Sequence, residues 1–89
     1  MPSKHAIVGS SVGLHARPAT LVAKAAAAYD DDILLRLVDM DPDDAVDAGS
    51  SMMIMTLGAE AGAEVVVESE NQAAVDEIAA LIERDLDAG

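Results

Sequence analysis

Four segments of the chain either run apolar or alternate apolar with polar residues, a pattern that is typical of β-strands. These predicted strands cover residues 4–8, 33–38, 45–48 and 63–68. The second segment places Ile33, Leu35 and Leu37 on one face, and the fourth does the same with Val65 and Val67. Each of these two strands therefore offers one apolar face to a core.

Three other segments repeat their apolar residues at helical spacing. A first helix is predicted over residues 16–29, and a short second helix over residues 52–57, with Ser50 or Ser51 as its N-cap. A third helix follows residues 69–72, which have the pattern of a capping box. The apolar face of this third helix consists of Val75, Ile78, Ala79, Ile82 and Leu86.

The predicted elements follow one another in the order β-α-β-β-α-β-α. No linker, internal repeat or low-complexity segment interrupts them, so residues 1–89 are expected to form one domain. Strands of this kind whose helices all pack on one face make an α+β sandwich, which is the fold class that the pattern predicts.

The charge of the chain argues against several classes of protein. Seventeen acidic residues against five Lys and Arg give a formal net charge of −12. Such a surface disfavours nucleic acid and anionic membranes as partners. No apolar run approaches the roughly 20 residues that cross a bilayer, and the first residues lack the apolar stretch of a secretory signal. We therefore expect a cytoplasmic protein with no membrane insertion.

Two further features of the composition resemble proteins from salt-loving cells. Hydrophobic residues make up 52% of the chain, but many of them are alanine, and there is no Phe or Trp. Lysine occurs only at Lys4 and Lys24. In molar salt the Debye length falls to about 3 Å, so repulsion within an acidic surface is screened. This combination favours a halophilic source over a merely acidic protein of a mesophile.

The run from Gly13 to Pro18 contains the residues most suited to chemistry. His15 directly precedes the first predicted helix, where Ser, Asp or Asn usually accepts hydrogen bonds from free amides. A phosphorylated imidazole would fill this role, because its oxygens would face the Ala16 and Arg17 amides at the positive end of the helix dipole. Arg17 can also pair with a phosphate in bidentate fashion. A loop histidine without function is the alternative, and the neighbouring arginine and proline make it less favoured.

The segment from Gly13 to Ala19 resembles the active-site motif of HPr, the histidine-containing phosphocarrier of the phosphoenolpyruvate-dependent sugar phosphotransferase system. The resemblance covers nearly the whole chain through its length, its element order, Lys24, and the segment from Ser50 to Gly58. It implies an open-faced β-sandwich, in which four antiparallel strands are covered on one face by three helices. It also implies a monomer.

This resemblance assigns roles to individual residues. His15 would take a phosphoryl group on Nδ1 from Enzyme I and pass it to an EIIA domain, with the phosphate bound by the Arg17 side chain and by the Ala16 and Arg17 amides. The docking surface for the partners would consist of Ala16, Thr20, Lys24, Met52 and Met53. The protein would be a phosphocarrier and not a stand-alone enzyme, and no cofactor is expected. No metal is expected either, because the sequence has no paired histidines or cysteines and no calcium-loop spacing.

Ser50 stands where many bacterial members of that family have a serine that a regulatory kinase phosphorylates. N-capping explains a serine at this position equally well, and Ser51 could cap the same helix. The methionines that follow also have two interpretations, because helical spacing would bury some of them. We expect Met52 and Met53 to be exposed for docking and Ile54 to be buried.

Two features depart from the family pattern. The acidic loop from Val38 to Asp44 is longer than in common members, and Ser11-Val12 replaces the usual asparagine-containing turn before the histidine. Both departures concern the choice of partner. The acceptor could instead be a dihydroxyacetone kinase subunit, or the chain could be a regulatory binding module.

We interpret His5 as an exposed strand residue and the acids of residues 41–47 as a solvated face.

Overall fold

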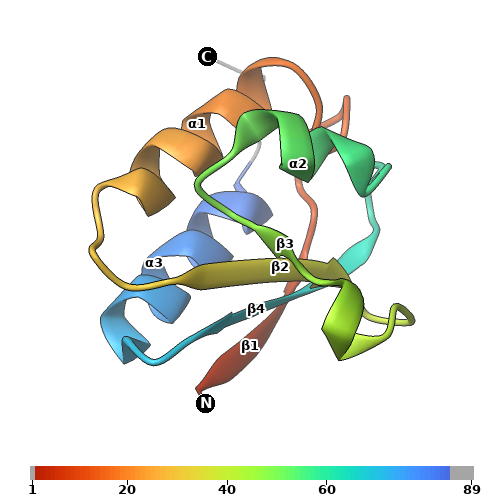
Figure 1. The fold of residues 1–89 in the computed structure, drawn as a ribbon. Helices are drawn as coiled ribbons and strands as arrows, with labels where there is room; N and C mark the ends of the chain where they lie inside the picture. The colour runs from red at the N-terminus through yellow and green to blue at the C-terminus, as the bar shows by residue number, and fades with distance from the viewer. Residues whose placement is uncertain (1, 85–89) are drawn as a thin grey trace.

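The computed structural model of the protein describes residues 2–84. Within this range, four strands form one antiparallel sheet (Figure 1). The strands are β1 (Ser3–Ile7), β2 (Ile33–Leu37), β3 (Val46–Asp47) and β4 (Glu64–Ser69). Their order across the sheet is β1-β4-β2-β3, and Val66 of β4 lies opposite both His5 of β1 and Arg36 of β2. The valine-rich strand β4 therefore has a strand neighbour on each side.

Three α-helices cover one face of this sheet, as Figure 1 shows. They are α1 (Arg17–Ala27), α2 (Ser51–Thr56) and α3 (Gln72–Glu83), and a short 3₁₀ helix, η1 (Pro42–Asp44), lies between β2 and β3. This arrangement confirms the predicted sandwich of four antiparallel strands and three helices. Among residues 2–84, no helix has the length and apolar character that a membrane crossing requires.

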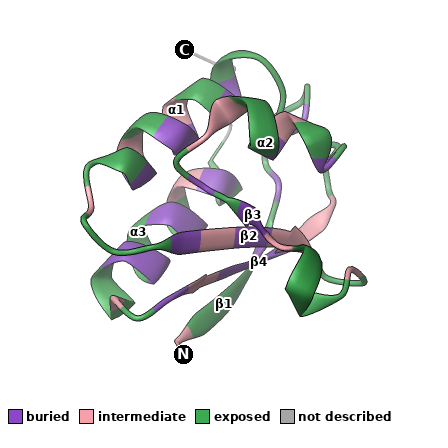
Figure 2. Cartoon of the chain, viewed as in Figure 1, coloured by how far each residue is buried: buried purple, intermediate pink, exposed green. Residues whose placement is uncertain are grey.

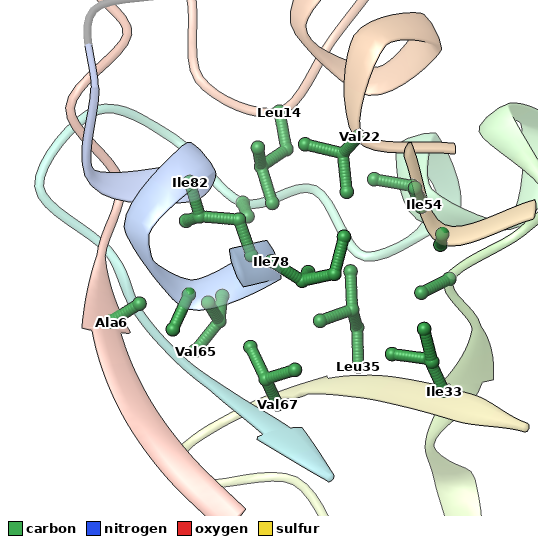
Figure 3. Packing of buried hydrophobic residues seen from close by; sticks show 14 of the residues in the cluster. Ala6, Leu14, Val22, Ile33, Leu35, Ile54, Val65, Val67, Ile78 and Ile82 are labelled. Atoms are coloured by element: carbon green, nitrogen blue, oxygen red, sulfur yellow. The ribbon is translucent and has the colours of Figure 1, made fainter. Parts of the chain in front are cut away.

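The core lies between the helices and the sheet (Figures 2 and 3). Its largest fully buried side chains include Leu14, Val22, Ile33, Leu35, Ile54, Val65, Val67, Ile78 and Ile82. Burial of one such side chain contributes about 1.5–3 kcal/mol. The buried face of α1 also contains Ala19, Ala23 and Ala26, so this helix packs against α2 and α3 largely through small side chains.

The first helix is shorter than the sequence predicts. It begins at Arg17, with Ala16 as its N-cap, and ends at Ala27, whereas the prediction extended it to Tyr29. The hydroxyl of Tyr29 donates a hydrogen bond to the Glu77 carboxylate of α3. This hydrogen bond is the main cause that raises the pKa of Tyr29 above its ordinary value of 10.0. Tyr29 therefore connects the chain after α1 to α3 and does not continue the helix.

The start of α3 also differs from the prediction, because the proposed capping box is wrong. Asn71 is the N-cap, and its side-chain oxygen accepts a hydrogen bond from the Ala74 amide at 3.2 Å. The Ser69 hydroxyl accepts a bond from the Asn71 amide and so holds the turn before the helix. Leu86, predicted to belong to the apolar face of this helix, lies outside the described residues.

The sheet face that points away from the helices is partly covered by its own charged side chains. Val66 is only 2% exposed, although strand alternation directs it to this face. Arg36 and His5 lie opposite it on the two neighbouring strands, and each has an acidic partner. Arg36 lies 3.5 Å from Glu68, and His5 shares a hydrogen bond with Glu64. The prediction that His5 is an exposed strand residue is confirmed.

Candidate functional site

The loop between β1 and α1 places His15 on the surface by anchoring the residues before it. Leu14 is 2% exposed, and its amide donates a hydrogen bond to the Ala59 carbonyl at 2.9 Å. Gly13 has a φ of 74°, and a Cβ at this position would lie 2.3 Å from the same carbonyl oxygen. Glycine is therefore required where this loop crosses the chain that follows α2.

His15 is exposed, and its ring forms no hydrogen bond with any residue that the structure describes. Ala16, and not His15, is the N-cap of α1. The predicted capping position of the histidine is therefore wrong by one residue. The exposed His15 residue nonetheless directly precedes this N-cap, beside the start of the helix.

Ala16 has a backbone conformation that residues with a side chain rarely adopt, with φ 51° and ψ −119°. Such a conformation costs on the order of 1–3 kcal/mol and persists only where the surroundings hold it. The buried Leu14 fixes the chain on one side. On the other side, the amide and the hydroxyl of Thr20 both donate to the Ala16 carbonyl at 3.1 Å. Sequence reasoning missed this feature, because alanine carries no sign of a positive φ.

The first turn of α1 presents positive potential next to His15. The amides of Ala16 and Arg17 have no hydrogen-bond partner within residues 2–84, and Pro18 has no amide hydrogen. No acidic residue lies in this turn, and the exposed Arg17 guanidinium pairs with none of the described residues. An anion at this position would meet backbone donors, the helix dipole and a guanidinium together.

An open hollow of about 230 Å³ lies beside His15. Its lining consists of Val12, Leu14, His15, Met55, Gly58, Ala59 and Glu60. The hollow forms where the loop after β1 meets the chain after α2, and Met55 brings α2 itself into the lining. Glu60 is the one carboxylate residue among these residues. Its place beside the histidine depends on a tertiary contact, which explains why the sequence did not single it out.

The residues predicted for docking lie on α1 and α2 or, in the case of Ala16, directly before α1, and these two helices pack against each other (Figure 1). Thr20 and Lys24 are exposed on α1, as is Ala16 before it. On α2, Met52 is 73% exposed and Met53 is 42% exposed. The expected exposure of these methionines and the expected burial of Ile54 are confirmed, while their role in docking stays a prediction.

Ser50 is the N-cap of α2, and its hydroxyl accepts a hydrogen bond from the Met53 amide at 3.3 Å. Ser51 is the first residue of the helix. Of the two serines that the sequence left open as caps, the structure therefore selects Ser50.

A second hollow, of about 250 Å³, lies at the C-terminal end of α1 and is lined in part by acidic residues. Asp30, Asp31, Asp32 and Asp47 contribute to its lining. Within residues 2–84, however, no group of three or more His, Cys, Asp or Glu side chains is placed to hold a metal ion. These carboxylates consequently carry no assignment as a metal site.

Comparison with known proteins relates the whole described chain to one family. Residues 2–84 match the family model described as the PTS HPr component phosphorylation site. The chain is 33% identical over 90 residues to phosphocarrier protein HPr of Streptomyces coelicolor, covering 98% of this chain and 94% of that protein.

Two solved structures of HPr proteins are similar in fold. The HPr of Bacillus anthracis superimposes with a TM-score of 0.80 and 28% identity, over 91% of this chain and 95% of the other. The HPr of Thermoanaerobacter tengcongensis superimposes with a TM-score of 0.83 and 28% identity, over 100% and 99% of the two chains. The architecture is therefore similar over essentially the full described length.

Proposed function

Because the chain belongs to the HPr family of phosphocarriers, we propose that His15 carries a phosphoryl group from Enzyme I to the EIIA domain of a sugar permease. The observation that supports this most strongly is local: an exposed imidazole stands beside helix amides and an Arg17 side chain that have no partner among residues 2–84. In this proposal residues 1–89 act as one monomeric phosphocarrier domain in the cytoplasm.

The proposed chemistry is a displacement at phosphorus. The Nδ1 lone pair of His15 attacks the phosphorus atom held by the donor, the bond from phosphorus to the donor breaks, and its electron pair stays on the donor. The transferred oxygens can then accept hydrogen bonds from the Ala16 and Arg17 amides and from the Arg17 guanidinium. Phosphoryl transfer is catalysed mainly by positioning and charge stabilisation. The carrier supplies part of the positioning and of the charge stabilisation, and the partner protein supplies the rest.

Docking in this proposal uses the surface formed by Ala16, Thr20, Lys24, Met52 and Met53. The exposed methionines can adapt to two different partners, because the Met side chain is unbranched and flexible. At high ionic strength the attraction between charged surfaces is screened. Recognition then rests on the short-range apolar contact that Met52 and Met53 offer, with Lys24 acting at close range.

Substitution of the histidine tests the proposal directly. When the protein is incubated with phosphoenolpyruvate and Enzyme I, His15→Ala is expected to take up no acid-labile phosphate. His5→Ala is the matched control, because His5 is the chain's other histidine and is exposed on β1. It should be labelled as fully as the wild type. Labelling of His15→Ala at the wild-type level would refute the proposal.

We further propose that a regulatory serine kinase modifies Ser50. A phosphate on its hydroxyl would lie at the start of α2, next to the exposed Met52 and Met53. A doubly charged group there would oppose burial of this apolar surface against a partner. Modification of Ser50 would thus act on docking and leave the His15 chemistry itself intact.

A further inference from the structure

Among the described residues that line the hollow beside His15, Glu60 is the only acidic one. One hydrogen bond and one close approach of the two chains place the Glu60 backbone against the loop that carries the histidine. The preceding residue, Ala59, accepts the hydrogen bond from the Leu14 amide, and a Cβ on Gly13 would lie only 2.9 Å from the Glu60 Cα. The other lining residues are apolar, so they offer no countercharge within the hollow. The Glu60 side chain itself is exposed and forms no ion pair with a described residue.

We propose that Glu60 destabilises the phosphorylated form of His15 and so favours release of the phosphoryl group to the next acceptor. The inference rests on the proposed function, since it concerns a phosphohistidine. A phosphoryl group carries close to two negative charges near neutral pH, and the Glu60 carboxylate repels it. Arg17 and the amides of α1 attract it. The stability of the phosphohistidine is set by the difference between these two effects.

The step on which Glu60 acts is the breaking of the N–P bond. In transfer, the acceptor's nucleophile forms a bond to phosphorus while the N–P bond breaks and its electron pair returns to the ring nitrogen of His15. In hydrolysis, a water oxygen takes the place of this nucleophile, inorganic phosphate leaves, and the water gives up its proton. Both steps remove the phosphoryl charge from His15. Repulsion by Glu60 is relieved in each, so Glu60 accelerates both.

The lifetime of the phosphohistidine measures this effect without any partner protein. His5→Ala leaves His15 as the only histidine, and in this background the small donor phosphoramidate phosphorylates the protein. Decay of the phosphohistidine signal is followed by phosphorus NMR at low salt. Adding Glu60→Gln should lengthen the lifetime roughly three-fold, the size expected for partly screened charges. Adding Glu70→Gln, an equal charge change in the exposed turn between β4 and α3, should leave it unchanged.

Two further measurements separate charge from structure. Glu60→Asp keeps the carboxylate and should keep the lifetime close to that of the His5→Ala parent. In molar KCl, where the Debye length is about 3 Å, the effect of Glu60→Gln should largely disappear. Equal lifetimes of the parent and of Glu60→Gln at low salt overturn the inference, as does a difference that molar KCl leaves intact. The proposed function fails separately, through absence of labelling by Enzyme I, because phosphoramidate requires no Enzyme I.

Discussion

Ala16 carries a strained backbone between the two side chains on which the proposed chemistry depends, His15 and Arg17. Its φ of 51° is held from both sides, by the buried Leu14 and by the two hydrogen bonds from Thr20. Strain of this kind is stored by the surrounding structure and occurs often at functional residues. The start of α1 is therefore already in place before a phosphate arrives.

Replacing Ala16 by glycine should stabilise the protein. Glycine adopts a positive φ without the steric penalty, so the substitution removes about 1–3 kcal/mol of strain from the folded state. The greater conformational freedom of glycine in the unfolded chain lowers the stability by about 0.5–1 kcal/mol. We expect Ala16→Gly to raise the free energy of unfolding by about 1 kcal/mol, measured by urea denaturation.

Ala80→Gly is the matched control for this substitution, because Ala80 is exposed in the interior of α3. The same exchange there should lower the free energy of unfolding by about 1 kcal/mol. A loss of stability in Ala16→Gly equal to that in Ala80→Gly would show that the backbone at Ala16 is not strained.

At this scale the sequence singled out the side chains of the proposed chemistry but not their surroundings. His15 and Arg17 could be selected because residue type, spacing and a helix start coincide there. Ala16 and Glu60 could not be selected. The φ of Ala16 depends on tertiary and helix contacts of Leu14 and Thr20, and Glu60 follows Ala59, whose carbonyl accepts a hydrogen bond from the loop before His15.

At the scale of single elements, periodicity was a sound guide where one face is fully buried. Val75, Ile78 and Ile82, predicted on one face of the last helix, are all fully buried. Helix ends were less predictable, because they depend on particular hydrogen bonds. Asn71 caps α3 in place of the expected capping box. Tyr29 lies beyond the end of α1, and its hydroxyl donates a hydrogen bond to Glu77.

The cap of α2 gives a test at this scale. A helix of six residues has few internal hydrogen bonds, so its stability depends strongly on its first turn. Ser50→Ala removes the acceptor of the Met53 amide. The bond is long, so we expect a loss near the lower end of the usual range for an N-cap, about 0.5–1 kcal/mol in thermal or urea unfolding.

Ser51→Ala supplies the comparison, because Ser51 is already inside the helix and alanine is the better helix former. Its free energy of unfolding should change by less than about 0.5 kcal/mol. Should Ser51→Ala prove the more damaging substitution, the cap has been assigned to the wrong serine. Such a result would also weaken the assignment of Ser50 as the modified residue, because Ser51 would then be the serine that caps α2.

For the whole molecule, charge is the dominant feature. The net charge is −12. Within residues 2–84, ion pairs join only Lys4 to Asp76, His5 to Glu64 and Arg36 to Glu68, so most of the acids face solvent without a cationic partner. Their mutual repulsion opposes the compact state at low salt. We therefore expect the free energy of unfolding, followed by circular dichroism, to rise from dilute buffer to molar KCl.

General effects of salt on apolar burial could also raise stability, so the test needs a change of charge alone. Asp30 and Asp32 are exposed beyond the C-terminal end of α1 and flank Asp31, so three like charges adjoin there, and Asp30 also opposes the helix dipole by about 0.3–1 kcal/mol. The double variant Asp30→Asn, Asp32→Asn leaves Asp31 in place to accept its hydrogen bond from Asn71. It should be more stable than the wild type by about 1 kcal/mol in dilute buffer, and the two proteins should converge in molar KCl, where the Debye length is about 3 Å. A stability gain of the same size at both salt concentrations would show that the salt response does not arise from repulsion among these acids.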